Sequence, residues 1–157
     1  MEFLIIKMIN NFEGYNAFLS NFYECPIVDK DGILYPTNEH YFQAYKTLNI
    51  EERKMIAAAV TPGQAKRMGR RVQLRTDWEQ VKESVMLDAL RLKFSNGLMQ
   101  DLLLTTGDQI LVEGNWWHDN EWGDCQCDKC IGIKGKNKLG NLLMFVRNEL
   151  REAKNAE

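Results

Sequence analysis

The order of hydrophobic and polar positions predicts strands early in the chain and helices after them. Residues 3–8 form an apolar run, and the polar turn 29–32 separates Ile27–Val28 from a second apolar run at 33–35. The first run predicts a strand. The other two predict a β-hairpin, because a glycine-containing polar turn between short apolar runs favours that connection.

Capping signals predict two helices in the middle of the chain. Thr37 can N-cap a helix that reaches about Leu48, with Glu39 in its first turn. Thr61 can N-cap a second helix that ends at Gly69. A threonine hydroxyl accepts a hydrogen bond from a backbone N–H at the helix start, and glycine commonly follows the last turn.

The second half of the chain is predicted to be mainly helical. A capping box at 76–79 indicates a long helix that stops at Gly97, followed by a shorter helix at 98–104 and a strand at 110–112. The last helix has apolar residues at helical spacing, namely Leu139, Leu142, Leu143, Val146 and Leu150. These elements predict one α+β domain over residues 1–157.

The segment from Glu113 to Gly140 has little regular pattern. Loops this long inside a compact domain are usually functional or disordered. This one contains Trp116, Trp117 and Trp122, which makes disorder the weaker interpretation. We therefore expect it to form a wall of an active site.

Composition and charge narrow the class of protein. The 157 residues are 45% apolar and 27% charged, as in ordinary globular domains, and the net charge of -2 argues against bulk-charge coating of nucleic acid. No apolar run is long enough for a membrane span, and Lys7 interrupts the N-terminal run with no cleavage site after it, so we expect no signal peptide. Three of the four cysteines crowd into 125–130, unlike a disulfide framework. We expect a soluble cytoplasmic protein with reduced thiols.

Two polar clusters are candidates for chemistry. Glu39, Gln43 and Lys46 share one face of the first predicted helix. From spacing alone, the favoured interpretation is a polar stripe that faces solvent. The alternative is that the carboxylate and the amine face one cleft. The second cluster has five basic residues between 66 and 75. Two interpretations of it, a solvated surface and a phosphate-binding site, are about equally favoured.

The late loop offers further candidates. Its tryptophans can cover the core or stack on a flat base. Gly123 beside Trp122 would let a ligand approach the backbone, and Asn137 could cap the last helix or bind an anion at its positive end.

The cysteines leave metal binding open. Cys125, Cys127 and Cys130 supply three soft ligands, and His118 or Cys25 could complete a structural zinc site. Because the usual paired C-x-x-C arrangement is absent, three reduced thiols packed in the loop are the favoured interpretation.

The sequence lacks the motifs of P-loop NTPases, dinucleotide oxidoreductases, zincins and α/β-hydrolases. Other short stretches, each weak alone, run in order across nearly the whole chain: FLSNF at 18–22, YPTNEHYFQAYK at 35–46, 61–62, 65–66, 69–70, Arg75, 77–78, 111–113, Asp119, 122–123, Asn137 and 139–144. Together they resemble the NADAR family, also called YbiA-like.

The resemblance implies a mostly helical α+β fold with a small N-terminal antiparallel β element, and N-glycosidase activity on ribosylated bases without a cofactor. Some members are associated with phosphoribosylamino intermediates of riboflavin biosynthesis, and others with removal of ADP-ribose from guanine in nucleic acid. We expect ADP-ribosylated guanine as the substrate, and phosphoribosylamino-pyrimidines are the alternative. The cysteine-containing insertion departs from the shortest members, so the part that the loop plays in substrate choice stays open.

Both substrate classes join ribose C1 to an exocyclic amino nitrogen, so the sugar can open to an imine. Lys46 is the expected nucleophile that forms a Schiff base, Glu39 the acid–base group, and Asp119 the group that activates water or holds ribose hydroxyls. A competing mechanism has Glu39 stabilise an oxocarbenium ion without a covalent bond. The residues expected to bind substrate are Trp122 by stacking, Lys66, Arg70 and Arg71 on phosphates, Asn21 and Asn137 on other polar groups, and Ser20, His40, Gln43 and Gly123.

Two other classes stay open: a non-catalytic module that binds ADP-ribose or nucleic acid, and a small zinc-binding adaptor. The slight acidity favours a small or single-stranded substrate over long duplex contacts. The sequence does not distinguish a base in DNA, in RNA or in a free nucleotide, and does not fix the oligomeric state.

Overall fold

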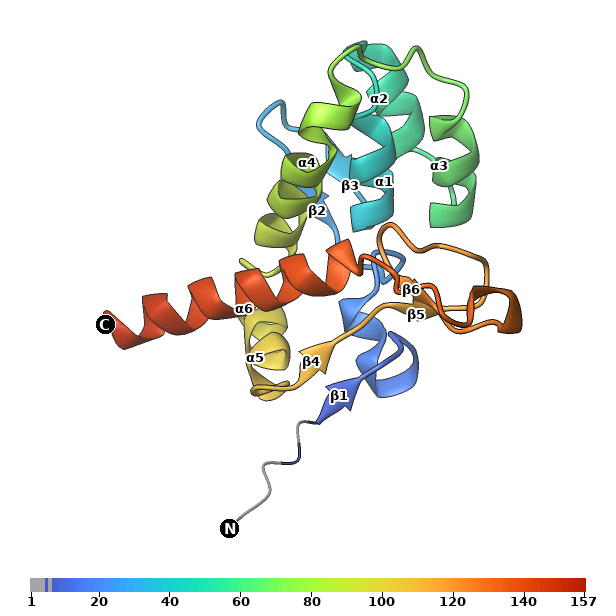
Figure 1. The fold of residues 1–157 in the computed structure, drawn as a ribbon. Coiled ribbons are helices and arrows are strands. Elements are labelled where there is room, and N and C mark those ends of the chain that lie inside the picture. The colour runs from blue at the N-terminus through green and yellow to red at the C-terminus, as the bar shows by residue number, and fades with distance from the viewer. Residues whose placement is uncertain (1–4, 6) are drawn as a thin grey trace. The chain divides into compact units, whose positions relative to one another are not determined.

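The structure is a computed structural model that describes residue 5 and residues 7–157 (Figure 1). The chain divides into two compact units. We call Asn21–Asn96 the central unit, and Met1–Ser20 with Gly97–Glu157 the terminal unit. The expectation of one domain over 1–157 stays a prediction, and each unit is described by itself.

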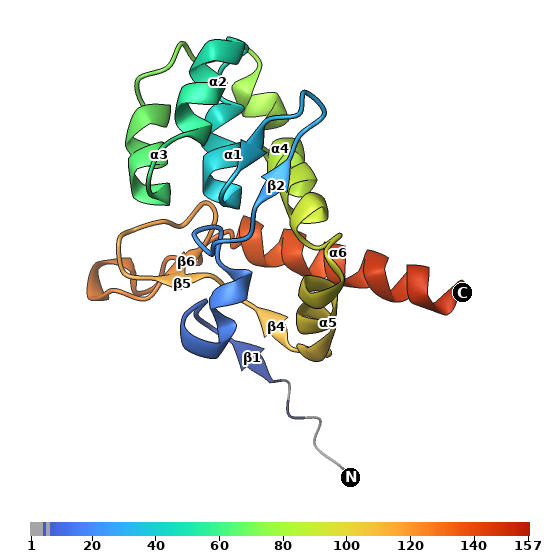
Figure 2. The ribbon, with the colours of Figure 1, turned by 180° about the vertical axis from the view of Figure 1, so that it is seen from behind.

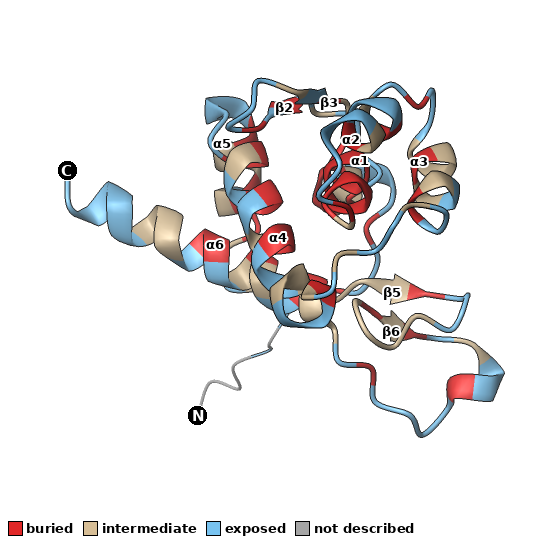
Figure 3. Cartoon of the chain, turned by 90° about the horizontal axis from the view of Figure 1, so that it is seen from above, coloured by how far each residue is buried: buried red, intermediate tan, exposed pale blue. Residues whose placement is uncertain are grey.

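The central unit is a helical cluster with a hairpin at its start. The strands β2 (Ile27–Val28) and β3 (Leu34–Tyr35) pair antiparallel, with Ile27 opposite Tyr35, which confirms the predicted hairpin. Four helices follow: α1 (Asn38–Ala44), α2 (Ile50–Ala57), α3 (Pro62–Gly69) and α4 (Trp78–Lys93). Helix α1 contacts each of the other three, and Figures 1 and 2 show it among them from both sides. All of its residues are buried, as the red ribbon of α1 in Figure 3 shows.

Two of the predicted caps form as expected. The hydroxyl of Thr37 accepts a hydrogen bond from the backbone N–H of His40 at 3.2 Å. The hydroxyl of Thr61 accepts one from Gln64 at 3.1 Å, with Pro62 in the first turn of α3. Both bonds satisfy N–H groups that lack a partner within the helix.

Three other expectations for the central unit are wrong. Helix α1 stops at Ala44 instead of Leu48, because the backbone tightens into bonds three residues apart and Asn49 caps the unpredicted helix α2. The capping box of Thr76 and Glu79 does not form, because α4 begins at Trp78 and Asp77 takes the N-cap position, one residue later than expected; the carboxylate of Asp77 makes no cap bond and pairs with Arg75 at 2.6 Å. Helix α4 ends at Lys93, and Gly97 begins the next helix instead of ending this one.

The terminal unit combines two helices with short parallel strand pairs. Its elements are β1 (Met8–Ile9), η1 (Gly14–Leu19), α5 (Gly97–Thr105), β4 (Ile110–Leu111), β5 (Gly114–Asn115), β6 (Asp124–Cys125), η2 (Asp128–Cys130) and α6 (Lys138–Asn155). Strand β1 pairs with β4, and β5 with β6. The predicted strand at 3–8 falls mostly outside the described residues.

Helix α6 packs one face against β4 and α5. Its buried apolar residues include Leu139, Leu143 and Val146 from the predicted stripe. The buried Arg147 donates from Nη1 to the hydroxyl of Thr106 and to the carbonyl of Gln109, each at 2.9 Å. No helix in the described part of the chain is long and apolar enough to cross a membrane.

Candidate active site

Helix α1 holds a buried carboxylate at its start. Glu39 is only 7% exposed. Its Oε1 accepts a hydrogen bond from Nε2 of Gln43 at 2.7 Å. The backbone N–H of Glu39 donates to the carbonyl of Asn21 at 3.0 Å. The interpretation of this face as a solvated stripe is therefore wrong, since Glu39 and Gln43 are both buried.

The amine of Lys46 lies just beyond the end of α1. Its residue is half-buried, and its backbone is held on both sides. The N–H of Lys46 donates to the carbonyl of Gln43 at 3.2 Å, and its own carbonyl accepts from the N–H of Arg75 at 2.8 Å. The backbone that carries this amine is thus fixed by neighbours in the central unit.

Several charges act on that amine. Burial lowers the pKa of Lys46, the carboxylate of Glu39 raises this pKa, and the cations of Arg70 and Lys66 lower it again. The net direction is a pKa below the ordinary lysine value. A lysine with a lowered pKa is neutral, and therefore nucleophilic, in a larger fraction of molecules at neutral pH.

The two cations come from the α3 helix and the residue after it. Helix α3 packs against α1, and this approach requires glycine at position 69. A Cβ on Gly69 would lie 2.0 Å from Oε1 of Gln43. The structure thus brings Lys66 and Arg70 into the electrostatic range of Lys46, and their binding of phosphate stays a prediction. Arg71 is exposed at the end of the same segment.

Several buried polar atoms of α1 and of Asn21, whose carbonyl bonds to the start of α1, have no protein partner. Within the described residues these atoms are Oδ1 of Asn21, Oε1 of Gln43 and both side-chain polar atoms of Asn38. More than nine in ten buried polar groups in proteins are paired, so such a group marks a place where another molecule can supply the bond. Asn38 was not identified as a candidate site residue from the sequence, because Thr37 already accounts for the N-cap of α1.

The ring of His40 is buried and pairs with neighbouring groups of the protein. The residue is 1% exposed, and its Nδ1 lies 2.8 Å from the hydroxyl of Thr37 while its Nε2 lies 3.0 Å from the carbonyl of Ala59. Burial lowers the pKa of His40, which favours the neutral ring. Both ring nitrogens already have protein partners, and a role in binding substrate stays a prediction.

A cavity of about 420 Å³ opens on the opposite face of α1, beside Tyr41 and Tyr45. It contains none of the predicted site residues. The hydroxyls of Tyr35 and Tyr45 both donate to the carboxylate of Asp29, at 2.8 and 3.0 Å. These three polar groups therefore bond to one another within the protein.

The remaining predicted site residues belong to the terminal unit. Oδ1 of Asp119 accepts hydrogen bonds from the backbone of Glu121 and Trp122, at 3.1 and 2.9 Å, which closes a tight turn. The ring of Trp122 is half-buried, with Nζ of Lys138 at 6.0 Å from its centre. Ser20 is half-buried at the end of η1. Their roles toward a substrate stay predictions.

Two residues of the late loop serve its internal packing. A Cβ on Gly123 would lie 2.3 Å from the carbonyl of Glu113, so the backbone itself needs glycine there. Asn137 has a left-handed φ of 49° and does not cap α6 through its side chain, so the expected cap is wrong, while binding of an anion or of substrate by Asn137 stays a prediction. Its amide instead accepts from the N–H of Glu113 at 3.0 Å and donates to the carbonyl of Leu111 at 2.9 Å.

The comparisons agree with this fold. Residues 10–151 match the model of the NADAR domain. With a match over most of its length, the chain belongs to the NADAR family, and its α+β, YbiA-like fold is confirmed.

The relatives include named enzymes. The N-glycosidase YbiA of Escherichia coli (strain K12) is 43% identical over 153 residues, which cover 96% of this chain and 91% of the relative. The NMR structure of E. coli YbiA has a TM-score of 0.80 and 40% identity, covering 98% of this chain and 94% of that chain. A riboflavin biosynthesis protein of Vibrio vulnificus is 37% identical over 140 residues, covering 87% of this chain but 36% of the relative. These names support an N-glycosidase of the NADAR family.

Proposed function

We propose that this chain is an N-glycosidase that hydrolyses the bond between ribose C1 and an exocyclic amino nitrogen of a base, through a Schiff base on Lys46. The observation that carries the proposal is the half-buried amine of Lys46, whose pKa is lowered, in electrostatic contact with the buried carboxylate of Glu39. An amine and a carboxylate are the two groups that such a reaction needs.

The reaction begins with opening of the sugar ring. A proton transferred to the ring oxygen breaks its bond to C1, and the nitrogen lone pair forms the C1=N imine. The neutral amine of Lys46 adds to C1, a proton passes to the base nitrogen, and the base leaves as its free amine. Glu39 carries these protons. Water then adds to the lysine imine, which releases the sugar aldehyde and restores the amine.

The cations support a phosphorylated substrate. Lys66 and Arg70 act on the same amine, and two cations suit about two negative phosphate charges, which a diphosphate and a phosphate monoester both carry. ADP-ribose attached to guanine, in a nucleotide or in single-stranded DNA or RNA, carries a diphosphate near the ribose. We propose ADP-ribosylated guanine as the first candidate substrate.

A second candidate is a phosphoribosylamino-pyrimidine. The match to the riboflavin biosynthesis protein of Vibrio vulnificus favours it, since this chain corresponds to part of that relative. Such a compound has the same C1–amino bond and a single phosphate.

A side-by-side comparison of the two substrates distinguishes these candidates. The enzyme is incubated separately with an oligonucleotide that carries ADP-ribosylated guanine and with a phosphoribosylamino-pyrimidine, and release of the free amine is followed. We expect faster release from the oligonucleotide. Faster release from the pyrimidine makes the second candidate the substrate, and release from neither contradicts the proposal.

Trapping tests the mechanism. Borohydride added during turnover should reduce the imine and leave a sugar covalently attached to Lys46, detected by peptide mass spectrometry. Lys46→Arg keeps the positive charge but cannot form the imine, so we expect no adduct and no turnover. Full activity of this variant would rule out the Schiff base and leave the oxocarbenium mechanism.

Glu39→Gln separates an enzyme from a binding module. The substitution keeps the shape of the side chain and removes its charge. We expect the variant to bind substrate and to release base much more slowly than the wild type. A wild-type protein that binds ADP-ribose without releasing any base would instead be a binding module.

A further inference from the structure

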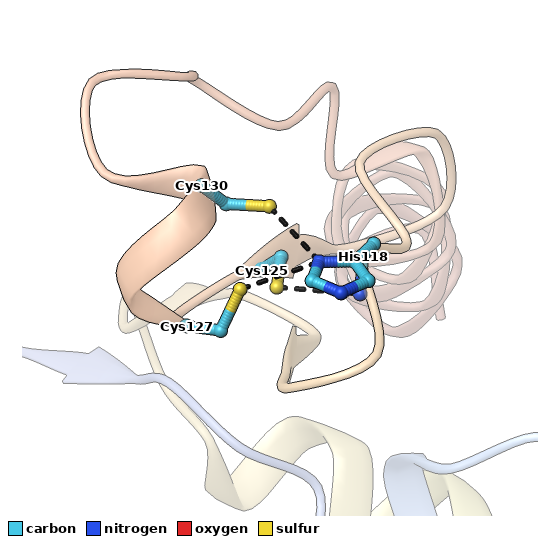
Figure 4. A group of neighbouring side chains, drawn as sticks. All are labelled: His118, Cys125, Cys127 and Cys130. Atoms are coloured by element: carbon cyan, nitrogen blue, oxygen red, sulfur yellow. Dashed lines mark hydrogen bonds between the residues drawn. The ribbon is translucent and has the colours of Figure 1, made fainter.

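Three thiols and an imidazole converge on one point in the late loop of the terminal unit (Figure 4). One ligand atom each of His118, Cys125, Cys127 and Cys130 lies within 4.8 Å of the others. Nδ1 of His118 is 3.3 Å from the sulfur of Cys127 and 3.4 Å from that of Cys130. In a tetrahedral zinc site, bonds of about 2.0–2.3 Å place neighbouring ligand atoms about 3.5–3.8 Å apart. The four side chains are therefore close to the arrangement that a zinc ion needs.

The local backbone builds this arrangement from three places. Strand β6 places Cys125 opposite Asn115 of β5. The η2 turn then brings Cys127 and Cys130 to one side, because the N–H of Cys130 donates to the carbonyl of Cys127 at 3.0 Å. Figure 4 shows the three sulfur atoms on the side of η2 and β6 that faces His118.

The neighbouring donors suit anionic sulfur. The backbone N–H of His118 lies 3.3 Å from the sulfur of Cys125, and Nδ2 of Asn120 lies 3.5 Å from that of Cys130. Hydrogen bonds to the ligand atoms orient and stabilise metal-bound groups. His118 also has a φ of 69°, a left-handed backbone conformation that is unfavourable for a non-glycine residue, and a metal–nitrogen bond would offset this cost.

The loop has little apolar material to hold it in place. Between 116 and 134 the buried residues are Gly123, Cys125 and Cys130, two of which belong to the cluster. Trp116 and Ile131 are 68% and 77% exposed. Small structures without a sufficient core commonly use a metal or disulfides to hold their fold. Three thiols cannot all pair as disulfides, so a metal explains the complete set.

We propose that Cys125, Cys127, Cys130 and Nδ1 of His118 bind a structural Zn²⁺. Three thiolates and one imidazole form a set of four tetrahedral ligands typical of structural zinc sites, with no position left for a substrate or a water molecule. Cys25, the other candidate for the fourth ligand, belongs to the central unit and is not part of the cluster. The zinc fixes the turn in which His118 precedes Asp119, so it stabilises the segment that also carries Trp122.

Metal analysis with matched variants tests the site. Protein purified without chelators should contain about one zinc per chain by mass spectrometry, and Cys25→Ser should retain it. Cys127→Ser should lose most of the zinc, because three ligands bind far more weakly than four. In the wild-type protein, replacement by Co²⁺ should give the absorption bands of a tetrahedral thiolate site.

A thiol titration on the wild-type chain gives an independent readout that does not depend on activity. In the zinc-bound protein a thiol reagent should react rapidly with Cys25 alone, and removal of zinc should expose three more thiols and increase proteolysis between 116 and 134. Absence of zinc after expression in zinc-supplemented medium, together with a thiol count that added zinc does not change, overturns the proposal.

Discussion

At the scale of single residues, the amine of Lys46 is subject to opposing influences. Burial and the cations of Arg70 and Lys66 favour its neutral form, while the carboxylate of Glu39 favours the ammonium form. A change in any of these neighbours should therefore move the pH at which the proposed nucleophile becomes active. The direction of each shift follows from the sign of the charge removed.

The first prediction concerns the pH dependence of the reaction. The rate of base release should rise with pH as Lys46 loses its proton. Arg70→Ala removes a cation, raises the pKa of Lys46 and should move this rise to higher pH. Glu39→Gln removes an anion and should move the residual activity to lower pH. Single-turnover rates between pH 5 and 10 measure both shifts, and Arg67→Ala on the exposed side of α3 is the control that should leave the profile in place.

The second prediction concerns a buried lysine outside the candidate site. Lys93 is 1% exposed, and its burial lowers its pKa from 10.5 to about 7. Protonation therefore costs more in the folded chain than in the unfolded chain. The stability contributed by neutral Lys93 is complete above pH 10.5, decreases as pH falls toward 7 and is constant below that.

The substitution Lys93→Met removes this cost and keeps an unbranched apolar chain. We expect a higher Tm at pH 6.5, by at least ~2 °C, since 1 kcal/mol shifts Tm by about 2–4 °C at this size. The gain should shrink as pH rises toward 10.5. Lys54→Met at an exposed position of α2 is the control, and an equal gain there would contradict the explanation.

At the scale of secondary-structure elements, the close packing of α3 on α1 determines where Gln43 lies. The space beside Gly69 is filled by the side chain of Gln43, whose Nε2 in turn donates to Glu39. The position of the buried carboxylate thus depends on the absence of a side chain on a neighbouring helix.

The third prediction uses two glycines of α3 as a matched pair. Gly69→Ala should displace Gln43, break its bond to Glu39 and destabilise the fold by about 1–3 kcal/mol. It should also reduce the catalytic rate more than it weakens substrate binding. Gly63→Ala meets no atom closer than 3.8 Å and should stabilise the helix by about 0.5–1 kcal/mol without loss of activity. Chemical denaturation and steady-state kinetics of both variants check this contrast.

The fourth prediction concerns the connection between β4 and α6. Asn137→Gly keeps the left-handed backbone but removes the two hydrogen bonds to Glu113 and Leu111, and should cost about 1–3 kcal/mol. Asn137→Ala loses the same bonds and adds about 1–2 kcal/mol of backbone strain. Equal stability of the two variants in urea would show that the backbone conformation is not strained.

The helices were predictable where a side chain caps them and no other partner competes for it. Thr37 and Thr61 have such positions, and both caps form. The cap expected from Thr76 does not form, since α4 begins one residue later and Asp77, at the N-cap position, pairs its carboxylate with Arg75 instead. Helix α2 was missed because its sequence has no clear apolar stripe, although Asn49 caps it through bonds to Glu51 and Glu52.

At the scale of the whole molecule, the net charge of -2 leaves binding of nucleic acid to a few local cations. The fifth prediction follows from their small number. With at most Lys66, Arg70 and Arg71 on phosphates, a plot of log KM against log salt for an oligonucleotide should have a slope no steeper than about 2. Lengthening the oligonucleotide should leave the slope unchanged. A slope that steepens with length would indicate an extended contact with nucleic acid.

The candidate site was only partly predictable from the sequence. Spacing placed Glu39, Gln43 and Lys46 on one face, but it could not show that the face is buried, since burial depends on α3 packing against it. The convergence of His118 with the cysteines was equally hidden, because it depends on the register of β5 and β6 and on one left-handed residue. Local patterns identify candidates, and long-range packing determines their surroundings.

The hydrogen bond from the N–H of Arg75 to the carbonyl of Lys46 has a consequence for how fast the proposed reaction can be. Because the main chain is held at this point, the position of the amine can vary only through rotation about the side-chain bonds of Lys46. Little ordering of the protein then has to accompany each turnover, so the activation entropy should be small. The turn that begins at Arg75 lies outside the groups proposed to react, yet it would help to keep the amine of Lys46 in position between one substrate and the next.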